Sequence, residues 1–350
     1  MRPAQLSFVL EREFFSTAEG HHTPVMLWGP PGVGKSQIVA QIGTRHDVPV
    51  IDIRLSQMEP SDLRGIPFRV GDTVEWAVPA ILPNETRHGP RGVLFLDEIT
   101  SAPPSVAAAA YQLILDRRLG EYRIPDGWAI FAAGNRQGDR GVTYAMPAPL
   151  ANRFSHFEME VNLDDWAFWA YAHGIDERLI AFLRFKPELI FAFDPARTLA
   201  GEMAFPSPRS WEFAHRALRK FSDHPEMLAG ALAACVGHAA GVECAAYIDS
   251  LDRLPDLDAI IDGREAAVPA EIDLQYAVAA ALAGRALRAR DKPEAQQVWG
   301  NILDYAQRLP LKEMGVMLVS DMHRGIGSKL FAVPQFAGWA HAVADLMLYE

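Results

Sequence analysis

Short apolar runs alternate with helical stretches over the first part of the chain. Helical periodicity covers Lys35–His46, Pro104–Arg117 and Pro149–Arg153. Strands that alternate with helices in this way form mostly parallel sheets. The pattern therefore predicts one α/β domain over residues 1–161. The five runs with the length and composition of buried strands are Pro24–Trp28, Val48–Ile53, Gly92–Leu96, Trp128–Ala133 and Phe154–Val161.

Two segments interrupt this alternation and predict hairpin insertions. The first, at about residues 66–82, places Gly71-Asp72 between two apolar runs, which is the signature of a two-residue hairpin turn. The second, at residues 119–128, is predicted to turn near Pro125-Asp126-Gly127. Trp76 on the first insertion and Tyr122 on the second are expected to be exposed and to suit contact with a partner protein.

From about Asn162 the strand pattern stops and only helices are predicted. We expect a helical lid over residues 162–250 and a helical extension over residues 251–350, with a connector at Leu251–Pro269. Asp164 and Asp165 favour the start of the first helix. Its aromatic residues, Trp166, Phe168, Trp169 and Tyr171, are expected to form lid core. The later helices are predicted at Glu177–Phe185, Arg209–Phe221, Pro225–Ile248, Leu274–Arg290, Pro293–Gln307 and Gln335–Leu348.

The composition is that of a globular protein and narrows the classes of function. The 350 residues contain 44 acidic and 33 basic residues, so the net charge of −11 disfavours nucleic acid as the main partner. The two cysteines, Cys235 and Cys244, lack the spacing of a zinc site. Glu11 and Glu13 follow the first apolar run and argue against a signal peptide. The apolar stretch Ala229–Tyr247 contains His238 and Glu243 and predicts a buried helix, not a membrane span. We expect a cytoplasmic protein.

A phosphate-binding loop follows the first predicted strand and opens the first helix after it. Such glycines allow backbone amides to close around phosphate groups, and the helix N-terminus adds a favourable dipole. Lys35 is expected to reach the β- and γ-phosphates of ATP, and Ser36 to ligate Mg²⁺. The predicted nucleotide-binding residues match GxxxxGK[ST] and its next position: Gly29, Pro30, Pro31, Gly32, Val33, Gly34, Lys35, Ser36 and Gln37.

Two carboxylates end the third predicted strand, in the run Gly92-Val-Leu-Phe-Leu-Asp97-Glu98. A buried parallel strand delivers its C-terminal end to the ligand crevice of the sheet. Asp97 is therefore predicted to hold Mg²⁺ together with Ser36. Glu98 is predicted to polarise the water that attacks the γ-phosphate.

With these two motifs the chain resembles the AAA+ ATPases, and within them the MoxR-type group, from about Pro24 to Trp211. Glu59-Pro-Ser-Asp62-Leu-Arg-Gly65 is similar to a MoxR-type stretch. The resemblance implies a P-loop fold with a five-stranded parallel sheet of order 5-1-4-3-2, a helical lid, and a ring that is usually hexameric. It also implies roles for Asn135 as sensor 1, Arg153 as the arginine finger and Arg209 as sensor 2. Arg136 and Arg140 stay open as alternatives to Arg153.

The leading hypothesis for function is Mg²⁺-dependent ATP hydrolysis in a homo-oligomer, coupled to remodelling, activation or metal insertion of a client protein. The resemblance implies a client with a von Willebrand factor A domain. One alternative is a nucleic-acid motor or loader, which the acidity disfavours. Another is a nucleotide-dependent scaffold with little turnover. The presence of Glu98 favours hydrolysis over the scaffold, because the scaffold does not need that carboxylate.

Overall fold

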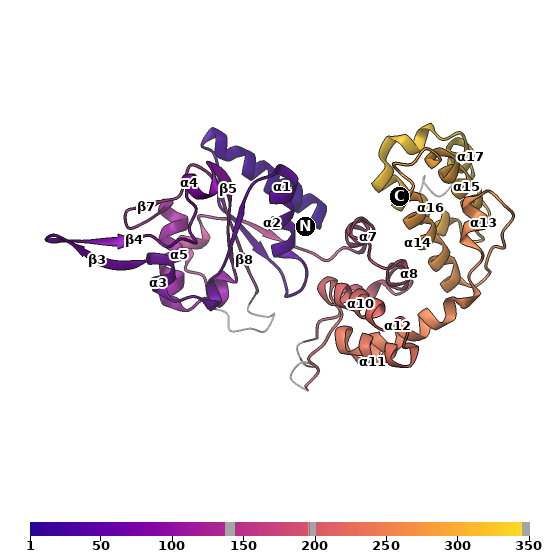
Figure 1. The fold of residues 1–350 in the computed structure, drawn as a ribbon, viewed down its shortest axis with the longest axis horizontal. Helices are drawn as coiled ribbons and strands as arrows, with labels where there is room; N and C mark the ends of the chain where they lie inside the picture. Colours follow the sequence, from indigo (N-terminus) through magenta and orange to yellow (C-terminus); the bar gives the residue numbers. More distant parts are fainter. Residues whose placement is uncertain (137–143, 195, 197–200, 345–350) are drawn as a thin grey trace. The chain divides into compact units, whose positions relative to one another are not determined.

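The structure is a computed structural model that describes all residues except 137–143, 195, 197–200 and 345–350. The chain divides into two compact units, residues 1–162 and 163–350 (Figure 1). The first unit carries the sheet. The described part of the second unit contains helices and their connections and no strand.

One five-stranded parallel sheet forms the centre of the first unit, and its strand order is β2-β5-β8-β1-β9. When these five strands are numbered 1 to 5 in chain order, the observed order is 2-3-4-1-5. Read from the opposite edge of the sheet, this is 5-1-4-3-2, so the predicted order is confirmed. The bounds of these strands are β1 Val25–Trp28, β2 Val50–Arg54, β5 Arg91–Asp97, β8 Gly127–Gly134 and β9 Ser155–Glu158.

Alternate residues of each strand point to opposite faces of the sheet. Both faces therefore carry apolar side chains, and helices cover both. Leu94 and Ile130 share one hydrophobic core with α5. α1 and α2 contact the strands as well, and alternate positions such as Phe131 are also fully buried. The helices of this unit are α1 Pro3–Ser16, α2 Lys35–His46, α3 Pro60–Arg64, α4 Glu85–His88, α5 Pro104–Asp116 and α6 Ala148–Ala151.

The first predicted hairpin is present as β3 (Ile66–Val70) and β4 (Thr73–Ala77), joined at Gly71-Asp72. The prediction for the second hairpin was wrong in its turn. Its strands are β6 (Arg118–Leu119) and β7 (Tyr122–Arg123), so the chain turns at Gly120-Glu121 and not at Pro125-Asp126-Gly127. Gly120 has a φ of 61°, which suits this turn.

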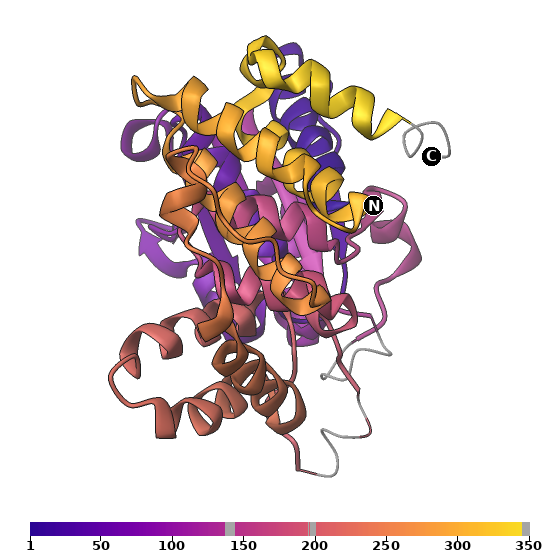
Figure 2. The same cartoon turned by 90° about the vertical axis from the view of Figure 1, so that its right-hand side faces the viewer.

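The second unit is a set of packed helices (Figures 1 and 2). The expected single helix Pro225–Ile248 is two helices, because Gly237 adopts a φ of 89° and ends the first of them. The helices are α7 Leu163–Ala172, α8 Glu177–Phe185, α10 Pro208–Lys220, α11 Pro225–Val236, α12 His238–Ser250, α13 Leu257–Ile261, α14 Ile272–Arg288, α15 Ala295–Gln307, α16 Lys312–Ile326 and α17 Pro334–Ala342.

Five of the described α-helices were not predicted: the short helices α3 and α4, and α1, α13 and α16. α1 begins with Pro3 at its first turn and buries Leu6, Leu10 and Phe14, a helical spacing that the short apolar run at the N-terminus concealed. α16 contains Gly315 and several β-branched residues, which weaken its local helical signal, and it is stabilised by packing against α14. α13 lies inside the expected connector.

The predicted lid and C-terminal extension pack together in this unit. Arg184 of α8 is paired with Asp164 of α7 and, at 2.6 Å, with Asp321 of α16. Arg324 lies 3.6 Å from Asp164 and from Asp165. Burial raises the pKa of Asp321 to about 6, although the Arg184 charge opposes the shift. This ionic network joins α16 to the first turn of α7. Within the described residues, no helix is both long and apolar enough to cross a membrane.

Candidate nucleotide site

The phosphate loop connects β1 to α2 and has the backbone that its glycines allow. Gly32 has a φ of 83° and Gly34 a φ of 105°, a region that L side chains rarely adopt. Gly34 is the N-cap of α2, so the loop leads directly into a helix N-terminus. The first amides of a helix have no partner within the helix and favour anions. The loop therefore has the form of a phosphate cradle.

Lys35 places a cation at this cradle. Its ammonium group donates hydrogen bonds to the carbonyl oxygens of Gly29 at 2.6 Å and Pro30 at 3.0 Å. It also donates to Oδ1 of Asn135 at 3.0 Å, although the two residues lie 100 positions apart in the sequence. Lys35 is buried. The side-chain amide of Asn135 is thus in direct contact with the lysine of the phosphate loop.

Ser36 and Asp97 meet where β1 and β5 end. Ser36 Oγ donates a hydrogen bond of 2.7 Å to Asp97 Oδ2. Two ligands in adjacent positions of a Mg²⁺ octahedron with bonds of ~2.1 Å lie about 3 Å apart. The two oxygens are hard donors at close to that spacing. This pair therefore fits Mg²⁺, with nucleotide phosphates and water as further ligands.

Glu98 follows Asp97 in the left-handed backbone region, with a φ of 56°. For a residue other than glycine this conformation is uncommon, and such strain gathers at functional sites. The Glu98 amide donates a hydrogen bond of 2.9 Å to Asp97 Oδ1. Its Oε2 accepts a short hydrogen bond from the hydroxyl of Ser56, which follows β2. Ser56 was missed by the sequence analysis, because nothing local distinguishes this serine from any other.

Asn135 is held at the end of β8 by Thr100. The Asn135 amide and Thr100 Oγ1 lie 3.2 Å apart, and the hydroxyl of Thr100 lies 3.2 Å from the Asn135 carbonyl oxygen. The preceding residue must be small, because a Cβ at Gly134 would lie 2.8 Å from Thr100 Oγ1 and from Met26 Cε. Gly134 therefore lets β8 approach Thr100 closely enough for Thr100 to hold Asn135.

The predicted arginines differ in their surroundings. Arg136 is paired with Glu158 of β9, whereas the guanidinium group of the exposed Arg153 has no ion pair or hydrogen bond with any described residue. Arg140 lies outside the described residues. Arg209 is exposed on α10 in the second unit, so its role at the nucleotide stays a prediction. Gln37 is exposed on the first turn of α2.

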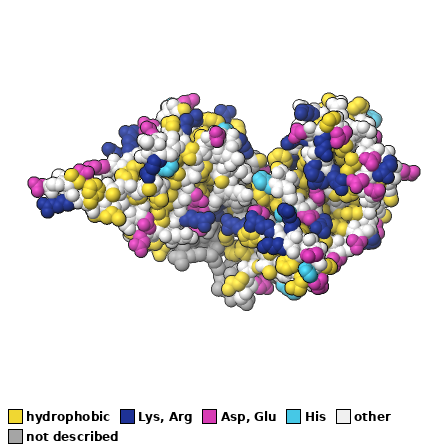
Figure 3. Space-filling model, viewed as in Figure 1, with side chains coloured by type: hydrophobic (Ala, Val, Ile, Leu, Met, Phe, Trp, Pro, Cys, Tyr) yellow, Lys and Arg dark blue, Asp and Glu magenta, His cyan; other side chains and the backbone are white. Residues whose placement is uncertain are grey.

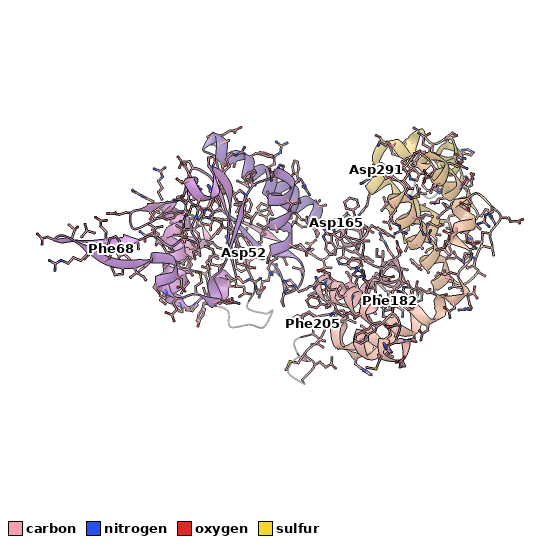
Figure 4. All side chains as sticks on the ribbon, viewed as in Figure 1. Asp52, Phe68, Asp165, Phe182, Phe205 and Asp291 are labelled. Carbon is pink, nitrogen blue, oxygen red and sulfur yellow. The ribbon has the colours of Figure 1, made fainter. Side chains whose placement is uncertain are left out.

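Asp52 of β2 is a further acid close to this site that the sequence analysis did not select (Figure 4). Its pKa is raised, first by burial and then by the negative charges of Asp97 and Glu98. The same field attracts a divalent cation to the edge of the sheet where these carboxylates gather.

The two insertion aromatics have different environments. Trp76 is 47% exposed. Tyr122 was expected to be exposed, but this was wrong: it packs on the core of the first unit, and its hydroxyl donates a hydrogen bond of 2.7 Å to the Pro83 carbonyl oxygen. Burial raises the pKa of Tyr122. Only Trp76 keeps the exposure that a partner contact needs.

Comparison with known proteins agrees with this geometry. Residues 24–154 match the AAA domain of the dynein-related subfamily. The denitrification regulatory protein NirQ of Pseudomonas aeruginosa is 31% identical over 109 residues, which are 31% of this chain and 41% of NirQ. The protein NorQ of Paracoccus denitrificans is 29% identical over 106 residues, which are 30% of this chain and 38% of NorQ. The chain thus spans about two fifths of the length of these relatives.

Among solved structures, the RuvB Holliday junction branch migration motor of Thermotoga maritima shares 17% sequence identity, with a TM-score of 0.35 over 74% of each chain. Because this TM-score is too low to support a fold assignment, the fold is assigned from the strand order of the sheet. The matched region contains the phosphate loop, both carboxylates and Asn135. The predicted resemblance to the MoxR-type AAA+ ATPases is therefore confirmed over residues 24–154, where the chain carries an AAA domain.

Proposed function

We propose that this protein hydrolyses Mg·ATP at sites shared between copies of the chain and uses the energy to remodel or activate a partner protein. The observation that carries the proposal is the contact of Ser36 with Asp97 at 2.7 Å, with Glu98 next in the chain. These groups supply a metal site and an adjacent carboxylate for the attacking water.

Each residue of the site has its own role in hydrolysis. The backbone of the phosphate loop and Lys35 bind the phosphates, and Ser36 and Asp97 hold Mg²⁺. Mg²⁺, when bound, neutralises charge on the phosphates. Glu98 polarises the attacking water, and Asn135 orients that water through a neutral amide. Since Asn135 contacts Lys35 at 3.0 Å, water positioning and phosphate binding are coupled.

An arginine from a neighbouring copy completes the site. Arg153 is the best candidate among the described arginines of this segment, because it is exposed and unpaired while Arg136 is bound to Glu158. An unpaired guanidinium retains all its donors for the charge that develops on the γ-phosphate. A site that needs this second copy requires an oligomer, and a hexameric ring is the form we propose.

The hairpin β3–β4 is the element we assign to the partner protein. All ten strand residues are exposed, and Ile66, Phe68, Val74 and Trp76 lie on it. Hydrophobic side chains follow its length (Figure 3), and Phe68 is labelled there in Figure 4. An exposed two-stranded hairpin is marginally stable alone. Contact with a partner would bury these side chains. A client with a von Willebrand factor A domain is our proposal for that partner.

The test is the steady-state ATPase rate as a function of protein concentration, with Glu98→Gln as the control. A rate per subunit that rises with concentration and is lost in Glu98→Gln supports hydrolysis at shared sites. A near-zero rate in both proteins, at every concentration and with tight ATP binding, would favour a nucleotide-dependent scaffold instead.

A further inference from the structure

A groove lies between α10 and α11 on the second unit. Its volume is about 690 Å³, and both helices contribute to its lining. Phe213, 43% exposed, and Met227, 54% exposed, are large apolar side chains on its two walls. Exposed side chains of this size next to one another are typical of interaction surfaces.

The α11 wall has the spacing of a helix-packing face. Met227, Gly230, Ala231 and Ala234 recur at i, i+3, i+4 and i+7, which places them on one stripe of the helix. Three of the four side chains are small. Since the distance between packed helices depends on the side chains at their contact, this stripe allows a second helix to approach closely.

Gly230 has no role in the fold that would require a glycine. A Cβ at this position would meet nothing within 4 Å. A glycine inside a helix is destabilising relative to alanine, so the fold alone favours alanine here. Glycine therefore keeps the groove open at its centre at the expense of helix stability.

The basic side chains of the groove lie on its α10 wall. Arg216 and Lys220 line it, and both are exposed. Arg216 is paired with Glu212 and lies 5.6 Å above the ring of Phe213. Glu226 is the one acid among the lining residues, and α11 carries no charge from Met227 to Val236. One long wall is thus cationic and the other is neutral and apolar.

We propose that this groove docks an amphipathic helix of a partner protein, with large apolar residues against α11 and acidic residues facing Arg216 and Lys220. An apolar stripe fits the small residues of α11, and an acidic edge is complementary to the cationic wall. This surface lies on the second unit, whereas the phosphate loop and the hairpin β3–β4 lie on the first.

The test uses the full chain without nucleotide and two fluorescein-labelled synthetic helices of about 18 residues, long enough to form several turns. One has leucines at i, i+3, i+4 and i+7 with glutamates along one edge, and the other has lysines in place of the glutamates. Fluorescence anisotropy should show the acidic peptide bound at least about tenfold more tightly. Arg216→Glu combined with Lys220→Glu should reverse this preference, whereas Arg253→Glu combined with Arg264→Glu, exposed positions elsewhere on the unit, should leave it unchanged.

Cys235 supplies a second readout, because it lines the groove while Cys244 is fully buried. The acidic peptide should slow alkylation of Cys235. Gly230→Leu should weaken peptide binding and leave the thermal unfolding temperature unchanged or higher. Equal affinity for the two peptides, or binding that ignores all these substitutions, overturns the proposal. If Gly230→Leu instead dissociates an oligomer of the chain in sedimentation velocity, the occupant is a second copy and the partner helix is wrong.

Discussion

Ser36 and Asp97 are joined by a hydrogen bond of 2.7 Å although 61 positions separate them in the sequence. The contact exists because β1 and β5 run parallel and end at the same edge of the sheet, where Ser36 opens the helix that follows β1. The predicted metal-binding pair is therefore brought together by the sheet.

Asp97→Asn should weaken the binding of Mg·ATP more than that of ATP alone. The substitution removes the charge that binds the metal, and charged hydrogen-bond partners contribute about 1.5–3 kcal/mol, or roughly 10–100-fold in affinity. Isothermal titration calorimetry with and without Mg²⁺ measures the difference. Asp52→Asn is the matched control and should have a smaller effect. Equal losses in the two variants would contradict the assignment of Asp97.

Ser56→Ala should raise the basal ATPase rate. The Ser56 hydroxyl competes with the attacking water for Glu98, and breaking one hydrogen bond costs about 0.5–1.5 kcal/mol, which corresponds to roughly 2–10-fold in rate. Ser56→Thr keeps the hydroxyl and should behave like the wild type. A fall in rate as large as that of Glu98→Gln would mean that Ser56 instead holds Glu98 in its active position.

Arg153→Ala should lower the ATPase rate by about 10³–10⁵ and leave ATP binding nearly unchanged, because the arginine acts on the transition state. A mixing experiment shows whether it acts in trans. Arg153→Ala retains Glu98, and Glu98→Gln retains Arg153, so a mixture of these two inactive proteins should regain activity at hybrid sites. Arg136→Ala is the control variant. Its mixture with Glu98→Gln should be no more active than a mixture of wild-type protein with Glu98→Gln in the same proportion. A mixture that stays inactive, in oligomers shown to exchange subunits, counts against a shared site.

Trp76→Ala should leave folding and the basal ATPase rate unchanged, since exposed substitutions usually alter stability by no more than about 0.5 kcal/mol. Stimulation of the ATPase by a partner protein should fall. Phe8→Ala on α1 removes another exposed aromatic, 58% accessible, from the same unit and is the matched control. Stimulation that is equal in the wild type and Trp76→Ala would remove Trp76 from the partner surface.

The stability of the first unit should fall as the pH is lowered from 7 to 5. His22 Nε2 accepts a hydrogen bond of 2.8 Å from the Ile130 amide, and Nδ1 lies 3.2 Å from the Glu13 carbonyl oxygen, so the ring is neutral. Burial, followed by the charge of Arg117, lowers the pKa of His22 from 6.5 to about 4. The unfolded chain therefore binds more protons between these values, and the stabilisation present above pH 6.5 is lost as the pH falls toward 4.

For His22 this loss is about 2 kcal/mol between pH 7 and pH 5. Urea unfolding at the two pH values measures it. His22→Gln should reduce the dependence on pH, whereas the same change at the exposed neighbour His21 should not. A slope that is unaltered by His22→Gln would assign the acid sensitivity to other groups.

The contiguous parts of the site were predictable from the amino-acid sequence. The phosphate loop and the two carboxylates each occupy one loop or strand end, and their spacing carries their chemistry. The five strands and their order also followed, the strands from composition and the order from the family resemblance. Local turn chemistry was less reliable: Gly71-Asp72 was a correct signal, whereas the signal at Asp126-Gly127 was outweighed by the pairing of Arg118–Leu119 with Tyr122–Arg123.

Which side chains contact one another depends on how the elements pack. Ser56 reaches Glu98, and Thr100 holds Asn135, through strands that are neighbours in the sheet and distant in the chain. The burial of Tyr122 and the packing of α16 through Asp321 likewise depend on contacts between distant segments. A pattern along the chain reports local propensity and burial, whereas the partners of a hydrogen bond or an ion pair are fixed only when the elements pack.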